Sequence, residues 1–454
     1  MEFNKRVVVA GAGKSGISAA KLLLEHGAEV IVFDQNDQLD KLEVLYKLND
    51  YERAGVVIGT LEEALLDTVE LMVISPGISV EAPFVKEFQK RNIPVWSEIE
   101  LAYHLTKGRI AAITGTNGKT TTTALVGAIC STYNPDSFTV GNIGIPFTEI
   151  AGNTTDRSMI VAEISSFQLE TVLDFHPKVS AVLNVTPDHL DRNHTFECYR
   201  ETKQKIAMNQ TKDEICVLNY DDEQTRSMEA SIPAKTVYFS RLSDLEEGVC
   251  LKGSQIVIRT GDNEIPVLSV EEMKLLGNHN IENYMAAIAI AYYMEVPVEQ
   301  IRKACMEFKG VEHRIEFVKE VRGVNYYNDS KGTNPDAAIK GIQAMNRPTI
   351  LIGGGYDKGV PFDDWIEHFD HKVRYLLLIG QTAEKIAETA KKHGFDAVIL
   401  EPDLEAAVKK SYELAEEGDA VLLSPACASW GQFDNYEQRG DLFKAYVQEL
   451  PELE

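Results

Sequence analysis

Long apolar runs, paired cysteines and positive charge are all scarce in this sequence of 454 residues. No apolar segment approaches the ~18–20 residues that a membrane-spanning helix needs, so we expect no membrane anchor. The six cysteines are scattered, and none forms a Cys-x-x-Cys pair. This spacing argues against a disulfide framework or a zinc knuckle and favours reduced thiols. The first residues show no signal-peptide pattern, and we therefore expect a cytoplasmic protein.

Basic residues are outnumbered, with 45 lysines and arginines against 70 aspartates and glutamates, which gives a net charge of −25. An acidic chain of this kind disfavours nonspecific binding to nucleic acid or to anionic membranes. A local group of lysines can still bind a phosphate, so the overall charge does not exclude nucleotide ligands.

The chain is long enough for about three domains, and it has no short repeat and no low-complexity linker. Predicted strands alternate with predicted helices, which favours an α/β fold with parallel sheets. We expect a Rossmann-like N-terminal domain at 1–97. A central domain at 98–306 would hold a P-loop ATPase-like parallel sheet with a small β element, and a Rossmann-like C-terminal domain would cover 307–454.

Local patterns give the expected elements. The strands are expected at 6–10, 29–33, 56–58, 71–75, 110–113, 159–164, 179–185, 215–219, 236–240, 324–327, 349–352, 375–379, 397–400 and 420–423. A hairpin is expected from 249–252 and 255–259, turned by Gly253 and Ser254. The main helices are expected at 17–26, 124–129, 278–294, 383–393 and 404–415.

The most informative segment is Gly115-Thr-Asn-Gly-Lys-Thr120, which follows an apolar strand and precedes a helix. Glycines at such a junction let backbone N–H groups face an anion, and the helix N-terminus adds partial positive charge. Lys119 would reach the terminal phosphates of a nucleotide, and the Thr120 hydroxyl would hold Mg²⁺. The loop is shorter than the usual P-loop, because Ile113 stands where the first glycine would be. The alternative is a glycine turn that only links a strand to a helix, but the Gly-Lys-Thr sequence favours ATP binding.

A second glycine loop, Gly11-Ala-Gly-Lys-Ser-Gly16, has the Gly-x-Gly-x-x-Gly spacing, and Asp34 ends the next strand. This fingerprint alone predicts an NAD-dependent dehydrogenase. A UDP-linked substrate offers the same diphosphate and ribose, with Lys14 and Ser15 as diphosphate contacts. The UDP hypothesis accounts for both glycine loops, whereas hydride transfer needs only one, so we favour it over the dehydrogenase.

Two polar side chains follow neighbouring segments of the central part. Glu163 ends a predicted strand, and His189 lies in a loop just after another. Both would lie at the carboxyl edge of the sheet, beside the phosphate loop, where Glu163 is a suitable Mg²⁺ ligand and His189 a plausible second one. A lone loop histidine is more often a surface hydrogen-bonding group. Lys203 lies on a predicted helix, and the residues alone predict only a solvated lysine.

Several segments together resemble the Mur ligase family: 115–123, 141–144, 162–170, 185–192 and 277–283. Further segments at 312–316, 328–334, 353–359, 423–429 and 437–440 resemble the members of that family that add D-glutamate. The resemblance covers nearly the whole chain. Sibling ligases and folylpolyglutamate synthases carry an aromatic-Ala-His type element after the aspartate, where this chain has Ser330-Lys331-Gly332, and this difference argues against them.

The resemblance implies an ATP-dependent amide ligase that uses UDP-N-acetylmuramoyl-L-alanine and D-glutamate in the synthesis of peptidoglycan precursors. It implies an acyl-phosphate intermediate, two Mg²⁺ ions and a CO₂-derived carbamate on Lys203. Because the residues assigned to ATP and to the amine lie in different domains, we expect the third domain to close over the second when substrates bind. We expect a monomer that binds neither nucleic acid nor membrane.

By the same resemblance, the catalytic residues are Lys119, Glu163, His189 and Lys203. The metal ligands would be Thr120, Glu163, His189 and carbamylated Lys203. The ATP site would comprise Gly115, Thr116, Asn117, Gly118, Lys119, Thr120, Thr121, His279, Asn280, Asn283, Arg314 and Asp329. The UDP-substrate site would comprise Lys14, Ser15, Asp34, Ser75, Gly77, Asn142, Ser165 and His189. The D-glutamate site would comprise Lys331, Thr333, Lys358, Ser429 and Tyr436.

Some of these residues have other plausible roles. Asn142 could be a turn residue, the asparagines at 280 and 283 could cap a helix, and Arg314 and Asp329 could belong to an interdomain salt bridge. Tyr436 stands where the resemblance leads us to expect phenylalanine.

Overall fold

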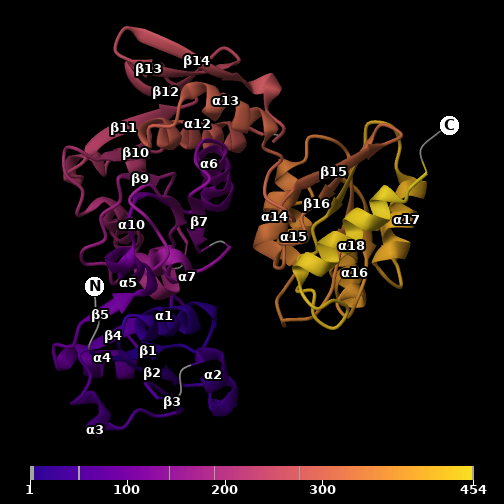
Figure 1. Cartoon of the computed structure of the whole chain (residues 1–454). Helices are drawn as coiled ribbons and strands as arrows, with labels where there is room; N and C mark the ends of the chain where they lie inside the picture. Colours follow the sequence, from indigo (N-terminus) through magenta and orange to yellow (C-terminus); the bar gives the residue numbers. More distant parts are fainter. Residues whose placement is uncertain (1–4, 50–51, 143, 189, 276, 452–454) are drawn as a thin grey trace. The chain divides into compact units, whose positions relative to one another are not determined.

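The computed structural model describes residues 5–49, 52–142, 144–188, 190–275 and 277–451. These residues form three sheets covered by helices and divide into two compact units (Figure 1). The first unit comprises residues 1–273 and 278–308, and the second comprises 274–277 and 309–454. The predicted α/β class with three parallel-sheet regions is confirmed, while the exact domain boundaries stay a prediction.

The N-terminal sheet of the first unit is entirely parallel, with the order β3-β2-β1-β4-β5. Its valine-rich central strand is buried on both faces, as expected of a parallel sheet between helices. The strand order reverses between β1 and β4, so the loops after these two strands lie where α/β proteins bind ligands. The elements are β1 (Arg6–Ala10), α1 (Lys14–Glu25), β2 (Glu29–Asp34), α2 (Lys41–Leu48), β3 (Ala54–Ile58), α3 (Glu63–Leu66), β4 (Leu71–Ile74), α4 (Pro83–Lys90), β5 (Val95–Ser97) and α5 (Glu98–Leu105).

The central sheet has nine strands in the order β14-β13-β12-β11-β10-β9-β6-β8-β7. Strands β6 to β12 run parallel, and β13 and β14 complete an antiparallel extension. The elements are β6 (Arg109–Thr114), α6 (Lys119–Tyr133), β7 (Ser137–Gly141), α7 (Thr148–Ala151), β8 (Met159–Glu163), α8 (Ser166–Leu169), β9 (Val179–Val182), α9 (Leu190–Asn193), α10 (Phe196–Gln204), β10 (Ile215–Asn219), α11 (Glu223–Arg226), β11 (Lys235–Ser240), β12 (Glu247–Lys252), β13 (Gln255–Thr260), β14 (Asn263–Ser269), α12 (Asn278–Tyr293) and α13 (Val298–Glu307), with 3₁₀ turns at Lys205–Ala207, Glu229–Ser231 and Val270–Glu272.

The second unit is built on a six-stranded sheet in the order β15-β16-β20-β17-β18-β19, in which only β15 is antiparallel to its neighbour. Two apolar cores lie on its two faces. The elements are β15 (Glu316–Val321), β16 (Val324–Asn328), α14 (Pro335–Ala344), β17 (Thr349–Gly353), α15 (Asp363–Glu367), β18 (Val373–Leu378), α16 (Ala383–Lys392), β19 (Val398–Leu400), α17 (Leu404–Leu414), β20 (Ala420–Leu423) and α18 (Tyr436–Gln448).

One apolar core is shared by the N-terminal and central sheets, since it includes Val9 and Leu23 together with Ile160 and Leu218. Glu98 lies in this region with 2% of its surface exposed, and it accepts hydrogen bonds from the backbone N–H and the hydroxyl of Thr148 at 2.7 and 2.9 Å. Burial raises the pKa of Glu98. In the part of the chain that the structure describes, no helix has the length and apolar character needed to cross a bilayer.

Candidate active site

The phosphate loop lies between β6 and α6, as the sequence predicted. Gly115 and Gly118 have φ angles of 156° and 82°, which favour glycine. The loop is held from the side by Asn184, which follows β9. Its side chain accepts a hydrogen bond from the Asn117 N–H at 2.8 Å and donates to the Asn117 carbonyl at 3.1 Å. These two hydrogen bonds tie the phosphate loop to the segment that follows β9.

The predicted lysines Lys119 and Lys203 meet at one carbonyl oxygen of this loop. Lys119 Nζ donates to Gly115 O at 2.8 Å and to Thr116 O at 2.9 Å. Lys203 Nζ, from α10, donates to the same Gly115 O at 2.9 Å. Two ammonium groups share one acceptor, so the phosphate loop gathers positive charge where the sequence predicted a triphosphate.

Lys203 is one of the most deeply buried polar side chains of the first unit, with 1% of its surface exposed. Its ammonium lies 4.5 Å from the centroid of the Tyr199 ring. Burial, together with repulsion from Lys119, lowers the pKa of Lys203 to about 7. A substantial fraction of this side chain is therefore an uncharged amine at neutral pH, which an ordinary solvated lysine is not.

Glu163 ends β8, and only 1% of its surface is exposed. Its Oε1 accepts a hydrogen bond from Asn142 Nδ2 at 2.7 Å, while its buried Oε2 has no hydrogen-bond partner among the described residues. A buried carboxylate oxygen without a donor is costly unless a cation binds it. Glu163 thus fits a divalent cation, and Asn142 orients it.

Helix α12 brings Asn283 to the phosphate loop. Thr122 donates to Asn283 Oδ1 at 3.3 Å, and Asn283 Nδ2 donates to Asn280 Oδ1 at 3.1 Å. A Cβ atom on Gly118 would lie 2.3 Å from Asn283 Oδ1, so this approach requires glycine at position 118. His279 and Asn280 lie on the first turn of the same helix.

The N-terminal glycine loop is braced by its own neighbours. Asp34 Oδ2 accepts a hydrogen bond from the Ala12 N–H at 2.8 Å, and Lys14 Nζ donates to the Gly144 carbonyl of the central region at 2.9 Å. Ser15 lies on the first turn of α1. Ser75 follows β4, and its buried hydroxyl has no partner among the described residues. The predicted UDP-substrate residues Lys14, Ser15, Asp34, Ser75 and Gly77 therefore follow β1, β2 and β4 at one edge of the sheet.

Three further predicted residues of the first unit lie at the N-termini of two helices. Thr120 and Thr121 lie on the first turn of α6. Ser165 caps α8, where its hydroxyl and the side chain of Gln168 form a capping box. His189 lies outside the described residues, so its predicted roles stay predictions.

In the second unit five of the predicted residues follow three adjacent parallel strands, and Tyr436 begins α18. Asp329, Lys331 and Thr333 come after β16, Lys358 comes after β17, and Ser429 comes after β20. The Lys331 ammonium lies 5.8 Å from the ring centroid of Tyr436, and that of Lys358 lies 5.2 Å from the ring centroid of Trp430. Two cations in loops that follow adjacent parallel strands suit a dicarboxylate ligand.

Asp329 is buried beside this edge, and burial raises its pKa to about 7. The Ser424 hydroxyl donates to Asp329 Oδ2 at 2.7 Å. Arg314 also belongs to this unit, and its attraction opposes the rise in the pKa of Asp329. The two residues are therefore electrostatically coupled within this unit, and their predicted contact with ATP stays a prediction.

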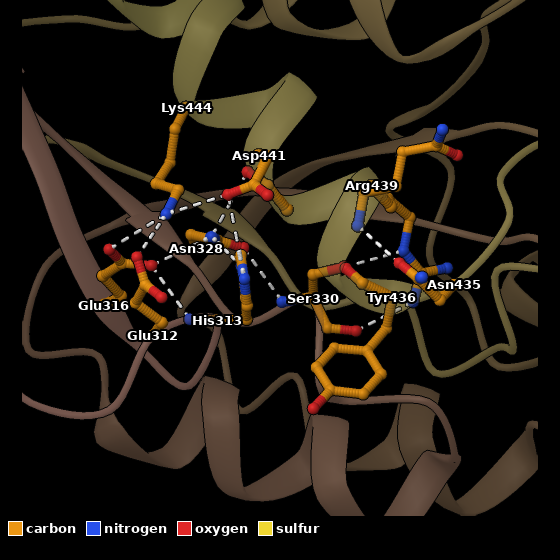
Figure 2. A network of polar contacts seen from close by, with 12 residues as sticks. Glu312, His313, Glu316, Asn328, Ser330, Asn435, Tyr436, Arg439, Asp441 and Lys444 are labelled. Carbon is orange, nitrogen blue, oxygen red and sulfur yellow. Dashed lines mark hydrogen bonds and ion pairs between the residues drawn. The ribbon is translucent and has the colours of Figure 1, made fainter. Parts of the chain in front are cut away.

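Sequence reasoning missed Arg439, which has no exposed surface. Figure 2 shows its guanidinium directed toward Ser330, to whose hydroxyl and carbonyl it donates at 2.9 and 2.8 Å. It also donates to the Cys427 carbonyl at 3.1 Å. Arg439 thus ties the loop that carries Lys331 to the loop that carries Ser429. The segment 437–440 was noted only as part of the resemblance, and no role was predicted for Arg439, because Ser330 lies 109 residues away in the sequence.

Three family models match the chain in succession. They are the Mur ligase MurD-like N-terminal domain over residues 5–97, the Mur ligase middle domain over 113–291, and the Mur ligase glutamate ligase domain over 313–427.

Among curated relatives, the UDP-N-acetylmuramoylalanine–D-glutamate ligase of Lachnoclostridium phytofermentans is 51% identical over 99% of this chain and 99% of its own. The enzyme of the same name from Lachnospira eligens is 53% identical over 98% and 99%.

Solved structures share the fold. The UDP-N-acetylmuramate-alanine ligase MurC of Thermotoga maritima has a TM-score of 0.59 at 18% identity, with 98% of this chain and 99% of that chain covered. MurF ligase of Thermotoga maritima in complex with ADP has a TM-score of 0.55 at 16% identity, with 98% and 95% covered.

Proposed function

Because this chain belongs to the Mur ligase family, we propose that it joins D-glutamate to UDP-N-acetylmuramoyl-L-alanine and converts ATP to ADP and phosphate. The observation that carries the proposal is the identity of 51% and 53%, over almost the whole chain, to two ligases named for this reaction. A dehydrogenase would use the N-terminal glycine loop alone, and the family membership leaves that alternative without support.

The chemistry explains why two nucleotide loops are needed. Amide formation in water is unfavourable, so the alanyl carboxylate first attacks the γ-phosphorus of ATP, and the bond to the bridging oxygen of ADP breaks. The glutamate amine then attacks the acyl phosphate and loses a proton, and phosphate leaves from the tetrahedral intermediate. The protein must hold the phosphates and the acyl group in line and exclude water.

Lys119 is suited to the first step, because its ammonium group lies at Gly115 O within the phosphate loop. A γ-phosphate offers Lys119 stronger acceptors than the two loop carbonyls it now contacts, so Lys119 would turn toward it. Asn283 and Asn280 would contact the nucleoside together with His279, Arg314 and Asp329. We assign diphosphate contacts to Lys14 and Ser15, and the acyl end of the UDP-substrate to Asn142, Ser165 and His189.

Thr120, Glu163, His189 and Lys203 would hold Mg²⁺, which supplies charge neutralisation for the transferring phosphoryl group. The unpartnered Oε2 of Glu163 supports this assignment. Lys203 would serve as a carbamate. Only the uncharged amine reacts with CO₂, and the lowered pKa of about 7 makes that form abundant at neutral pH.

The D-glutamate site would comprise Lys331, Thr333, Lys358, Ser429 and Tyr436. The domains would extend over 1–97, 98–306 and 307–454, a division that the three matched segments support. We further propose that the enzyme is a monomer that acts in the cytoplasm, where ATP and UDP-linked precursors are made.

Phosphate release measured with each combination of substrates tests the proposal. We expect release only when UDP-N-acetylmuramoyl-L-alanine, D-glutamate and ATP are all present, and little release with L-glutamate. Release that instead requires L-alanine and UDP-N-acetylmuramate, or glutamate and a folate, would assign the chain to a sibling reaction.

The carbamate is tested separately. Lys203→Ala should abolish turnover, and a short added carboxylate should restore part of it. Wild-type activity should also rise with bicarbonate in buffer stripped of CO₂. Absence of both effects would remove the carbamate from the proposal while leaving the reaction itself in place.

A further inference from the structure

Arg192, on α9, makes four hydrogen bonds to two different parts of the first unit. Its Nε and Nη2 donate to the two carboxylate oxygens of Glu170 at 2.9 and 2.7 Å. Its Nη1 donates to the Pro76 carbonyl at 2.8 Å, and its Nη2 also donates to the Ile78 carbonyl at 2.9 Å. One guanidinium thus joins the central region to the loop that follows β4.

The ion pair of Arg192 with Glu170 is largely buried, and the guanidinium packs on an aromatic ring. The side chains of Arg192 and Glu170 are 13% and 12% exposed. The guanidinium carbon lies 4.0 Å from the centroid of the Phe167 ring, which covers one face. A two-point arginine–carboxylate pair fixes orientation as well as distance, so this pair defines where the loop of residues 75–78 can lie.

That loop forms one wall of the N-terminal glycine cradle. The Ile78 N–H donates to the Ser75 carbonyl at 3.0 Å, which closes a turn around Pro76 and Gly77. A Cβ atom on Gly11 would lie 2.5 Å from Ser75 Oγ, so the turn presses directly against the glycine loop. Arg192 binds the carbonyl groups on both sides of Gly77, and a shift of this turn would therefore alter the cradle.

Glu170, the partner of Arg192, lies close in sequence to the residues that we assign to phosphoryl transfer. Glu170 immediately follows the single-turn helix α8, whose cap is Ser165. Ser165 in turn is two residues from Glu163, whose unpartnered oxygen we assign to the metal. The connection from the turn at Gly77 to Glu163 thus passes through one salt bridge and one short helix.

We propose that Arg192 is a positioning residue that sets the distance and orientation of the UDP-substrate relative to Glu163. This inference rests on the proposed function, because it concerns the placement of the substrate in that reaction. Arg192 touches no reacting atom; it acts through the turn at 75–78 and through Glu170. Lysine would keep the charge but could not contact Glu170 and both carbonyls in the same geometry.

The test compares steady-state kinetics of Arg192→Lys and Glu170→Gln with the wild type. We expect the KM for UDP-N-acetylmuramoyl-L-alanine to rise at least tenfold in both variants, while the KM values for ATP and D-glutamate change less than twofold. The double variant should be no worse than the more impaired single variant, because both changes break one contact. Equilibrium binding of the UDP-substrate should weaken by the same factor.

Arg302→Lys is the matched control. Arg302, on α13, also binds one glutamate and one backbone carbonyl, those of Glu272 and Val267, and both partners lie outside the two glycine loops. It should leave all three KM values unchanged. Equal losses of kcat with every KM unchanged, or an unchanged KM for the UDP-substrate in Arg192→Lys, would overturn the inference. Wild-type enzyme that shows no turnover with these substrates would instead refute the proposed function.

Discussion

At the scale of single residues, Glu163 has a buried carboxylate that needs a cation nearby. Its Oε2 is buried without a donor, and its Oε1 is held by Asn142. Glu163→Gln keeps the shape and removes the charge. We expect kcat to fall by about 10²–10³-fold, the range seen when one transition-state electrostatic contact is lost, with a higher Mg²⁺ requirement in phosphate-release assays.

The control for this substitution is Glu197→Gln, which removes an exposed carboxylate from α10. It should leave both kcat and the Mg²⁺ dependence unchanged. Near-normal turnover of Glu163→Gln at every Mg²⁺ concentration would show that Oε2 of Glu163 has no role in cation binding.

Lys203 gives a second prediction, on the pH dependence of stability. Burial lowers its pKa in the folded protein to about 7, against the ordinary value of 10.5 for lysine. Below pH 7 both states are protonated and the cost of burying the charge is fully present. Between pH 7 and about 10.5 the unfolded chain binds more protons, so the free energy of unfolding rises with pH, by on the order of 1 kcal/mol per pH unit.

Lys203→Met should lack this contribution. The difference in unfolding free energy, wild type minus variant, should therefore become more favourable to the wild type from pH 7 to pH 9. Urea denaturation in CO₂-free buffers measures it. A difference that stays constant over this range would mean that Lys203 is charged in the folded protein.

At the scale of elements, the turn between β1 and α1 depends on Gly16. A Cβ atom there would lie 1.8 Å from the Gly11 carbonyl oxygen, a backbone atom that cannot move alone, whereas a Cβ on Gly13 meets nothing within 4 Å. Gly16→Ala should destabilise the protein by about 1–3 kcal/mol and weaken UDP-substrate binding. Gly13→Ala should change the unfolding free energy by less than about 0.5 kcal/mol. Equal stabilities of the two variants in denaturant titrations would contradict this account.

The same elements show what sequence patterns could and could not predict. Buried parallel strands gave strong signals, and β1 and β10 have the predicted bounds. The helix α1 begins at Lys14 rather than Ile17, because its first turn carries no apolar residue beyond the glycines. Strand β14 was not predicted. It contains Pro266, which pairs opposite Val257 where the register shifts, and proline there removes the usual strand signal.

The residues of the site also differ in how well the sequence predicted their positions. Residues at strand ends, such as Glu163 and Asp329, could be placed from the sequence because parallel strands end at a common edge. Arg192 could not, because its partners lie 22 and 114–116 residues away. The burial of Lys203 was also invisible, since an isolated lysine on a helix predicts a solvated side chain.

At the scale of the whole molecule, the shared core predicts how the chain unfolds. The N-terminal and central sheets contribute to one apolar core, while the second unit has cores of its own. We therefore expect the two sheets of the first unit to unfold together. The three tryptophans can report this, because Trp96 lies on β5 of the N-terminal sheet and Trp365 and Trp430 belong to the second unit.

The variant Trp365→Phe/Trp430→Phe leaves Trp96 as the reporter of the N-terminal sheet. A nonhydrolysable ATP analogue with Mg²⁺ should bind at the central phosphate loop. At a free concentration of about 100 times its Kd, it stabilises the folded region that binds it by about 2.7 kcal/mol. If the sheets unfold as one, the melting temperature seen by Trp96 fluorescence should rise by several degrees, although the nucleotide does not touch that sheet. The same melt of Lys119→Ala, which weakens the nucleotide site, should show little shift. An unshifted Trp96 transition in the parent variant, with calorimetry showing a separate stabilised transition, would mean that the shared core does not couple the two sheets.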